Sequence, residues 1–454
     1  MRVLLVSVNR VRTPYPVHPI GLDYLAGALA PAHEVQILDL CPLAEGEVER
    51  AILSAIKEHG PEAVGLSLRN IDSLEANAAT GFLPGAKRVA EIVRSATDAP
   101  LILGGPGFTI FPAELVRSLG ADFGVVGEGE RARALVDALE AKADPLGLPG
   151  VLCPGHPPPA PVPLQPGEEG RRAPPGNNPA LGFYLAHGGM LGIQTQRGCR
   201  LRCVYCTYPQ IEGRVLRTFD AEAVLSEARA LEEAGARYLV LTDSVFNNSP
   251  AHALAVAAAF RRGGIRLPWG GFFAPSAPPD GFYEALREAG CTHAEFGTES
   301  LSDAVLPRIK KPFRRADVFR AHAAARAAGI HVAHFFALGG PGETAATAEE
   351  TLDGCEELAG AALFFFCGMR IYPRTDLFSV AVAEGQIRRE EDLLEPVFYR
   401  PDGLDLGDLV RAVRRRGEGR RGWVVGTGGE FSGIVSRLHA RGRSGPLWEL
   451  IADA

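Results

Sequence analysis

Short apolar segments alternate with amphipathic segments along most of the chain. In the first 130 residues, continuous apolar runs occupy positions 3–8, 35–40, 63–66, 101–103 and 123–126. Between them, Leu22, Leu25 and Leu29 recur at spacings of three and four, which is typical of one helix face. Apolar strands separated by helices favour a parallel sheet buried on both faces. The pattern predicts an α/β fold, with a Rossmann-like doubly wound domain over residues 1–146.

A second alternating series begins after residue 185. Its expected strands are 191–196, 238–242, 269–273, 292–297, 331–338 and 363–371, and helical segments such as 221–234, 279–289 and 345–358 separate them. Six strand–helix units predict a (βα)6 partial TIM barrel over residues 186–394, with the active site at the carboxyl ends of the strands. Residues 147–185, rich in proline and glycine, are expected to be a linker. Residues 395–454 form a C-terminal region without a predicted role.

Composition narrows the class of protein. The chain has 454 residues and a net charge of −7, so it has room for two or three domains and no overall basic field for nucleic acid. No apolar run is long enough to span a bilayer, and the first residues do not make a signal peptide. Eight cysteines are too few for a disulfide scaffold in a chain of this length, which favours a reducing, cytoplasmic location.

Three cysteines carry the most specific signal. Cys199, Cys203 and Cys206 follow directly after the first strand expected in the barrel. Thiolates this close in sequence can converge on a soft metal centre. Structural zinc normally takes four protein ligands, whereas an iron–sulfur cubane held by three thiolates keeps one iron open to another ligand. The alternatives are three structural cysteines, or zinc with a distant fourth ligand.

The Cys-x3-Cys-x2-Cys loop after a first barrel strand, with Tyr205 before its last cysteine, resembles the radical S-adenosylmethionine (SAM) superfamily. The resemblance implies a 4Fe–4S cluster whose fourth iron is chelated by SAM. It also implies that an electron from the cluster cleaves SAM to a 5′-deoxyadenosyl radical, so that the cofactors carry the difficult chemistry. The electron would come from an external reductant such as flavodoxin or ferredoxin.

The same resemblance assigns cofactor contacts to the ends of the later strands and to the glycine-rich turn at 338–344. Taken separately, polar residues at strand ends are often only caps, and this turn is also an ordinary strand-to-helix connection with Thr344 as the helix cap. The expected SAM contacts are Tyr205, Asp243, Ser244, Glu299, Ser300, Gly339, Gly340, Pro341, Gly342, Glu343, Arg370 and Tyr372.

Glycine loops at 104–109 and 125–130 make the N-terminal domain similar to the cobalamin (B12)-binding domains that precede many radical SAM enzymes. The Asp-x-His-x-x-Gly loop of histidine-ligating cobalamin proteins is absent. A non-coordinating Arg69 would then face the lower side of the corrin; the alternative is that Arg69 pairs with Asp72. The expected cobalamin contacts are Ser67, Arg69, Asn70, Gly104, Gly105, Thr109, Gly127 and Glu128.

Three further features allow competing interpretations. Tyr208 and Glu212, just after the cluster loop, either shape the pocket or, for the tyrosine, donate a hydrogen atom to a substrate radical. His322 lies on an alanine-rich helix and is expected at the surface. A basic run either docks an acidic electron donor or is a solvated helix face; it comprises Arg411, Arg414, Arg415, Arg416, Arg420 and Arg421.

The leading expectation is a radical SAM enzyme that uses cobalamin to methylate carbon of a small molecule, a secondary metabolite such as an antibiotic precursor. One alternative keeps the radical step but dehydrates, epimerises or rearranges the substrate, for example an aminoglycoside sugar, without methyl transfer. Another is a non-catalytic sensor or electron carrier that only binds the cluster and the corrin.

Overall fold

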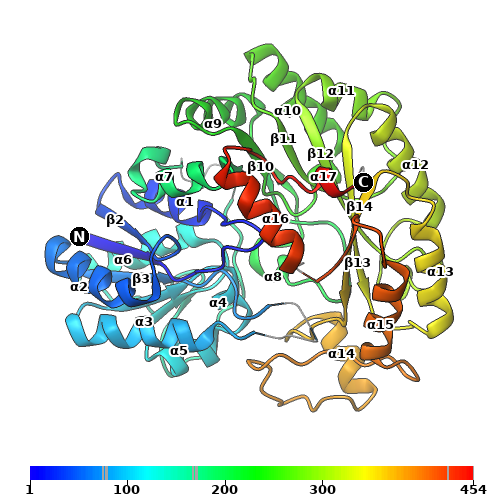
Figure 1. Ribbon diagram of the computed structural model, residues 1–454. Helices are drawn as coiled ribbons and strands as arrows, with labels where there is room; N and C mark the ends of the chain where they lie inside the picture. Colours follow the sequence, from blue (N-terminus) through cyan, green and yellow to red (C-terminus); the bar gives the residue numbers. More distant parts are fainter. Residues whose placement is uncertain (74–75, 77–79, 166–167, 169–171, 427–428, 453–454) are drawn as a thin grey trace.

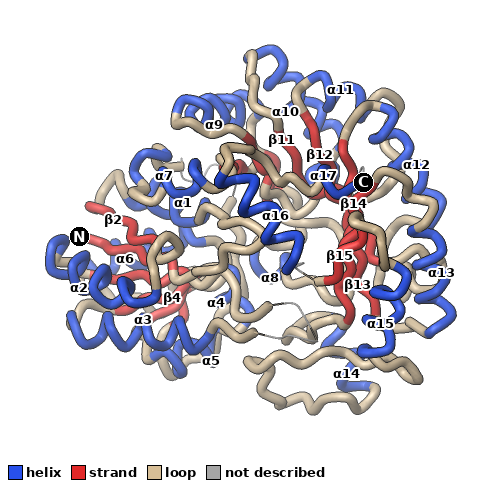
Figure 2. Tube along the Cα trace, viewed as in Figure 1, coloured by secondary structure: helices blue, strands red, loops and turns tan. Residues whose placement is uncertain are grey.

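Two mainly parallel sheets, each flanked by helices, make up the two halves of the molecule (Figure 1, Figure 2). The computed structural model describes the chain except residues 74–75, 77–79, 166–167, 169–171, 427–428 and 453–454. The α/β fold class expected from the apolar pattern is confirmed, and every apolar run named above lies in or overlaps a strand.

The N-terminal sheet has the order β2-β1-β3-β4-β5-β6, which is doubly wound about β1. Its strands are β1 (Arg2–Ser7), β2 (Glu34–Asp39), β3 (Ala63–Ser67), β4 (Leu101–Gly104), β5 (Phe123–Val125) and β6 (Val151–Leu152). Its helices are α1 (Ile20–Leu29), α2 (Val48–His59), α3 (Leu83–Ala96), α4 (Pro106–Ile110), α5 (Pro112–Leu119) and α6 (Ala132–Glu140). Val3, Leu4, Leu5 and Val6 are all buried because helices cover both faces of the central strand.

The second sheet has the order β15-β14-β13-β12-β11-β10-β7, and all its paired strands are parallel. Its strands are β7 (Met190–Ile193), β10 (Tyr238–Leu241), β11 (Trp269–Phe273), β12 (Cys291–Glu299), β13 (His331–Leu338), β14 (Ala361–Cys367) and β15 (Trp423–Val425). Its helices are α9 (Ala221–Glu233), α10 (Pro250–Gly263), α11 (Phe282–Glu288), α12 (Arg315–Ala327), α13 (Ala345–Cys355), α14 (Asp376–Ala383) and α15 (Leu406–Arg416).

The structure differs from the expected six strands at the far edge of this sheet. The C-terminal region supplies a seventh strand, β15, which pairs with β14 from Leu363↔Trp423 to Phe365↔Val425. Two further helices, α16 (Gly429–Ala440) and α17 (Glu449–Ala452), follow it. Phe431 of α16 packs edge-on against Phe364 of β14 at 5.8 Å between ring centroids. The tail is therefore part of the barrel rather than an appendage.

The segment at 147–185 does more than connect the two halves. Val151 and Leu152 form β6, which pairs antiparallel with β5 at the edge of the N-terminal sheet. Near its end, α7 (Leu181–Ala186) places the Tyr184 hydroxyl 2.6 Å from Asp39, to which it donates a hydrogen bond. Arg172 forms buried ion pairs with Asp23 and with Glu227 of α9. This segment thus ties the two halves together.

No helix in the described part of the chain is long and apolar enough to cross a membrane.

Candidate active site

The three cysteines lie on a loop whose two ends are paired. Residues 196–197 form β8 (Gln196–Arg197), which pairs antiparallel with β9 (Arg217–Thr218). Gly198 follows at φ 83°, and a Cβ added there would lie 2.2 Å from the Val215 carbonyl oxygen. Only glycine fits this close approach. The paired neck holds the cluster loop, residues 198–216, in a closed shape.

The thiols share one electrostatic environment. Burial, together with the neighbouring Cys203 and Cys199, raises the pKa of Cys206 to about 12. Burial also raises the pKa of Cys203, and Lys311 opposes that shift. Thiols that suppress one another's ionisation in a buried place suit a cationic centre that would stabilise all three thiolates.

The donor set fits a cluster better than a single ion. Within the described residues, no three His, Cys, Asp or Glu side chains are close enough together to hold one metal ion. A cubane instead takes one thiolate on each iron. Cys199, Cys203 and Cys206 would hold three irons and leave the fourth for another ligand.

A lysine that sequence analysis did not identify lies beside the cysteines and the residues expected at SAM. Lys311 Nζ lies 3.0 Å from Glu299 Oε1 and also approaches the ring of Tyr205, whose hydroxyl donates to the same carboxylate oxygen at 2.6 Å. Glu299 sits at φ 64°, an uncommon conformation for a residue other than glycine. Both Tyr205 and Glu299 were expected near SAM, and the structure brings them together beside Cys203. Lys311 belongs to no motif, so only its position in space reveals it.

Asp243 and Ser244 form hydrogen bonds with the residues at the start of the cluster loop. The buried Asp243 carboxylate accepts hydrogen bonds from Thr195 N at 2.7 Å, Thr195 Oγ1 at 2.6 Å and Gln196 N at 3.1 Å. Burial raises the pKa of Asp243 to about 7, although these hydrogen bonds oppose the shift. Ser244 Oγ donates to the Gly198 carbonyl at 3.4 Å. These side chains position the loop, and their contact with SAM stays a prediction.

The side chains of the glycine-rich turn bond within the protein. Glu343 is buried and accepts from Gly339 N at 3.3 Å and from Thr347 Oγ1 at 3.0 Å. Burial raises its pKa to about 7. Gly339 has φ 87° and no room for a Cβ, which would lie 2.7 Å from Leu406. Ser300 is likewise bonded to Thr351 of α13. What Gly339, Gly340, Pro341 and Gly342 can offer a cofactor is therefore their backbone.

Arg370 and Tyr372 contact the N-terminal domain. The Arg370 guanidinium lies 3.0 Å from Asp72 in an ion pair whose two side chains are 2% and 0% exposed, and the Tyr372 hydroxyl donates to the same carboxylate at 3.2 Å. The alternative that Asp72 pairs with Arg69 is wrong, because Asp72 is occupied by a residue 298 positions away. Both side chains therefore join the two domains, and their contact with SAM stays a prediction.

Glu128 is a second link between the domains. Its carboxylate lies 2.9 Å from Arg217 and 3.3 Å from Arg197, and Glu130 lies 2.6 Å from Arg197. All four side chains are buried. Burial opposes the charge on Arg197, but Glu130 and Glu128 raise its pKa above the ordinary value. The side chain of Glu128, expected at cobalamin, is thus engaged by the neck of the cluster loop.

The remaining residues expected at cobalamin lie along the carboxyl edge of the N-terminal sheet. Gly105 has φ 96°, and a Cβ there would lie 2.7 Å from the Leu68 carbonyl, so the loop after β4 packs directly on the loop after β3. Thr109 Oγ1 accepts from Gly127 N at 2.9 Å, which fastens the loop after β5 to that after β4. Ser67 and Gly104 are register partners at the ends of β3 and β4.

Arg69 and Asn70 stand out at this edge because their side chains are exposed. Solvent reaches the Arg69 side chain, but the surrounding loops still desolvate its guanidinium and lower its pKa, while Tyr208, Tyr184 and Tyr15 raise it. Among the described residues, no acidic side chain lies within ion-pair distance of Arg69. The edge, with its compact glycine loops and an unpaired guanidinium, fits a large flat ligand held from the side of the N-terminal sheet.

The structure places Glu212 and His322, whereas hydrogen-atom donation by Tyr208 stays a prediction. Glu212 accepts from Gly198 N at 3.1 Å and from Gln194 at 2.9 Å, so it braces the cluster loop. The expectation that His322 is at the surface is wrong: it is buried and bonded to His334 of β13 at 3.1 Å, because the small alanines of α12 bring that helix close to the sheet.

Three of the six arginines of the basic run pair with this chain's own acidic residues. Arg416 pairs with Glu349, Asp353 and Glu356 of the neighbouring α13 and its end, Arg420 also pairs with Glu356, and Arg411 pairs with Asp408. A solvated helix face explains these three residues, and docking of an acidic electron donor on Arg414, Arg415 and Arg421 stays a prediction.

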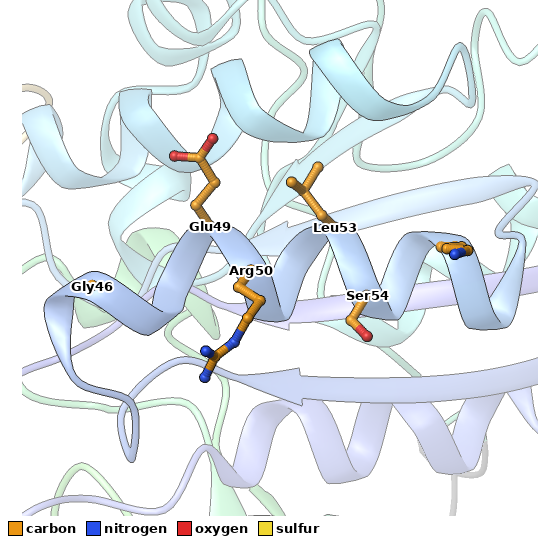
Figure 3. A pocket seen from close by; sticks show the side chains of 6 residues that line it. Gly46, Glu49, Arg50, Leu53 and Ser54 are labelled. Carbon is orange, nitrogen blue, oxygen red and sulfur yellow. The ribbon is translucent and has the colours of Figure 1, made fainter.

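A surface hollow lies far from this chemistry. Figure 3 shows it over α2, with Glu49, Arg50, Leu53 and Ser54 on its lining. Glu49 is already paired with Arg88, so the hollow offers no converging reactive groups.

Known proteins match both halves of the chain. Residues 193–355 match the Radical SAM superfamily, and residues 6–137 match the B12 binding domain. The chain is 28% identical over 451 residues to the tryptophan 2-C-methyltransferase of Streptomyces laurentii, covering 82% of this chain and 73% of that protein. It is also 28% identical over 400 residues to an uncharacterized methyltransferase of Pyrococcus horikoshii, covering 84% of this chain and 83% of that one.

Solved structures agree. The radical SAM methyltransferase TsrM of Kitasatospora setae, with cobalamin and a 4Fe–4S cluster bound, superposes with a TM-score of 0.76 at 26% identity, over 89% of this chain and 79% of that chain. The same enzyme with tryptophan and aza-SAM bound gives a TM-score of 0.84 at 23% identity, over 98% of this chain and 97% of that chain. At 23% identity, the similarity to the tryptophan-bound structure shows that the fold is shared.

Proposed function

Because residues 193–355 match the Radical SAM superfamily and residues 6–137 match the B12 binding domain, we propose that the chain methylates carbon of a small molecule with cobalamin and SAM. When bound, the cluster and SAM supply a 5′-deoxyadenosyl radical that abstracts hydrogen, and cobalamin supplies the methyl group. A secondary metabolite is the proposed class of substrate. The relatives include methyltransferases acting, by their names, on tryptophan and on cytidylyl-2-hydroxyethylphosphonate.

One observation carries the proposal: the carboxyl ends of the two sheets are clamped against each other. Glu128, after β5, binds the neck of the cluster loop, and Asp72, after β3, binds Arg370, after β14. Arg374 adds two hydrogen bonds to the carbonyls of Thr109 and Ile110, at 2.8 and 3.0 Å. Ligands of parallel α/β sheets bind at these ends. A corrin on one side and a cluster on the other would therefore face a common space.

The chain's own residues hold this arrangement. Cys199, Cys203 and Cys206 would bind the cluster, with Lys311 and Glu299 beside it. Ser67, Asn70, Gly104, Gly105 and Gly127 would line the corrin, and Arg69 would face its lower side without binding the metal. The domain boundaries proposed for this division of labour are 1–146, 147–185, 186–394 and 395–454.

Product accounting under anaerobic reduction tests the proposal. Purified enzyme, reconstituted with iron, sulfide and hydroxocobalamin, is incubated with SAM, a strong reductant and candidate substrates. Methylation through a substrate radical gives one S-adenosylhomocysteine and one 5′-deoxyadenosine for each methylated product. 5′-Deoxyadenosine without S-adenosylhomocysteine would favour dehydration, epimerisation or rearrangement of the substrate. S-adenosylhomocysteine without 5′-deoxyadenosine would support methyl transfer and exclude a reaction through the radical.

If the enzyme consumes no SAM at all, the remaining interpretation is a non-catalytic sensor or electron carrier. A Cys203→Ala variant is the control, since it removes one cluster ligand. We further propose a cytoplasmic enzyme that receives electrons from flavodoxin or ferredoxin. Reduction of the reconstituted cluster by flavodoxin, followed by its electron paramagnetic resonance signal, tests that partner directly.

A further inference from the structure

The inner face of the barrel is lined by aromatic rings on neighbouring strands. Side chains of a strand alternate between its two faces, and in β13 and β14 the alternate members Phe336 and Phe365 lie in the core beneath the outer helices. Phe335 and Phe364 lie on the opposite face and stack at 4.9 Å between centroids. Phe272 of β11 meets Phe335 edge-on at 6.4 Å and is 45% exposed. The inner face thus presents ring surface that the protein does not cover.

A single carboxylate accompanies these rings. Glu295 of β12 is the register partner of Phe272 and of Ala333, so its side chain belongs to the same inner face. It is half-buried. Its one recorded hydrogen bond comes from Trp448 Nε1 at 3.1 Å. Within the described part of the chain, no lysine, arginine or histidine forms an ion pair with it.

Glu449, the acidic residue beside this face, already has a partner of opposite charge. Glu449 pairs with His293 at 3.1 Å, one inward-facing position before Glu295 on β12. Burial raises the pKa of Glu295 to about 7, with only the Trp448 hydrogen bond opposing the shift, whereas the pKa of Glu449 is lowered by its histidine partner despite burial. Of these two carboxylates, Glu295 is the one left without a positive partner.

Segments from the N-terminal and C-terminal parts of the chain lie beside this carboxylate. Trp448 belongs to the buried cluster that also contains Phe431 of α16, and Tyr15 of the N-terminal domain packs on that cluster. Tyr15 is close enough for the Glu295 charge to raise its pKa. Its ring also meets His439 of α16 at 6.3 Å. Figure 1 shows α16 between the two sheets, at the place where the halves meet. Glu295 therefore lies beside segments of the C-terminal tail and of the N-terminal domain, where these meet the barrel.

From this geometry we propose that Glu295, together with Phe272 and Phe335, binds the substrate of the methylation, and that this substrate is an aromatic molecule bearing a protonated amine. The inference rests on the proposed function and names its class of substrate. A half-buried carboxylate without a cation is costly unless a ligand supplies the charge. Aromatic faces favour both a second ring and an adjacent cation. An anionic substrate would meet Glu295 with like charge.

The test compares three probes that share an indole ring and differ in the charge at the end of the side chain: tryptamine, tryptophol and 3-indolepropionate. Binding to the reconstituted holoenzyme is measured by equilibrium dialysis at pH 7.5 without reductant, so no turnover is needed. Wild-type enzyme should bind tryptamine at least about tenfold more tightly than tryptophol, and 3-indolepropionate least. Glu295→Gln should weaken tryptamine about 10- to 100-fold, as for a lost hydrogen bond to a charged group, and leave tryptophol within about twofold.

Glu284→Gln is the matched control, because Glu284 is an exposed carboxylate on α11 of the same domain. It should change none of the three affinities. A Glu295→Gln variant that keeps the wild-type preference would overturn the inference, as would wild-type enzyme that prefers 3-indolepropionate or binds none of the probes. Product accounting with SAM is a separate readout. Its failure would refute the proposed function without touching the binding preference.

Discussion

The neck of the cluster loop places two buried arginines directly opposite each other. Arg197 and Arg217 are register partners of β8 and β9, and like charges in that position destabilise an antiparallel pair. Glu128 and Glu130 of the N-terminal domain neutralise them. Replacing Glu128 with glutamine keeps the size of the side chain and removes its charge. We expect this change to loosen the neck and thereby the loop that carries the cysteines.

The size of the effect follows from burial. Removing one partner of a buried ion pair costs about 3–5 kcal/mol, because the other charge stays buried without compensation. We expect about 3 kcal/mol for Glu128→Gln, since the amide oxygen can still accept one of the hydrogen bonds. The matched control is Glu288→Gln, which breaks the pair of Arg261 and Glu288 at 2.7 Å on the surface. A pair that exposed contributes below about 1 kcal/mol.

Two measurements on the apoprotein check this prediction. Urea unfolding followed by circular dichroism gives the loss in free energy of unfolding for each variant. Limited trypsin digestion reports on the loop itself, because Arg200, Arg202 and Arg214 are exposed cleavage sites within 198–216. Glu128→Gln should be cut there faster than wild type and retain less iron after reconstitution. Equal stability and equal cleavage in the Glu128 and Glu288 variants would refute the reasoning.

Three further predictions follow from the same structure. Alanine at any of the three loop cysteines should abolish iron binding, measured as iron per chain, whereas alanine at the buried Cys367 should leave it unchanged. Asp72→Asn should cost about 3–5 kcal/mol of unfolding free energy in urea, because Arg370 then keeps a buried charge without its acidic partner; a loss below 1 kcal/mol would show that the pair is dispensable. The raised pKa of Glu295, about 7, means that the folded state holds a proton which the unfolded chain has released. Wild-type stability relative to Glu295→Gln should therefore fall from pH 5 to pH 8, and a constant difference in urea midpoints would contradict the assignment.

Much of the architecture could be predicted from the sequence because its signals are local. Most parallel strands are largely apolar runs of a few residues, because burial on both faces leaves few polar positions, so runs such as 3–8 and 331–338 are visible without any partner. The three cysteines likewise occupy eight residues of one loop, so their spacing alone indicates a shared centre. The resemblance to the radical SAM superfamily rested on that loop, and a radical SAM domain and a B12-binding domain are both confirmed by the matches to residues 193–355 and 6–137.

What only the tertiary structure decided is which side chain meets which. Glu128 and Asp72 stand at strand ends where a cofactor contact is expected, yet their carboxylates pair with arginines 89 and 298 positions away. Short β15 carries too weak a pattern to be recognised, and pairing with β14 creates it. The neighbours of His322, Lys311 and Glu295 likewise come from elements that are distant in the sequence. Hydrophobic periodicity specifies where a chain forms strands and helices, but the neighbours of a polar side chain depend on how distant elements pack, and that information is spread over the whole fold.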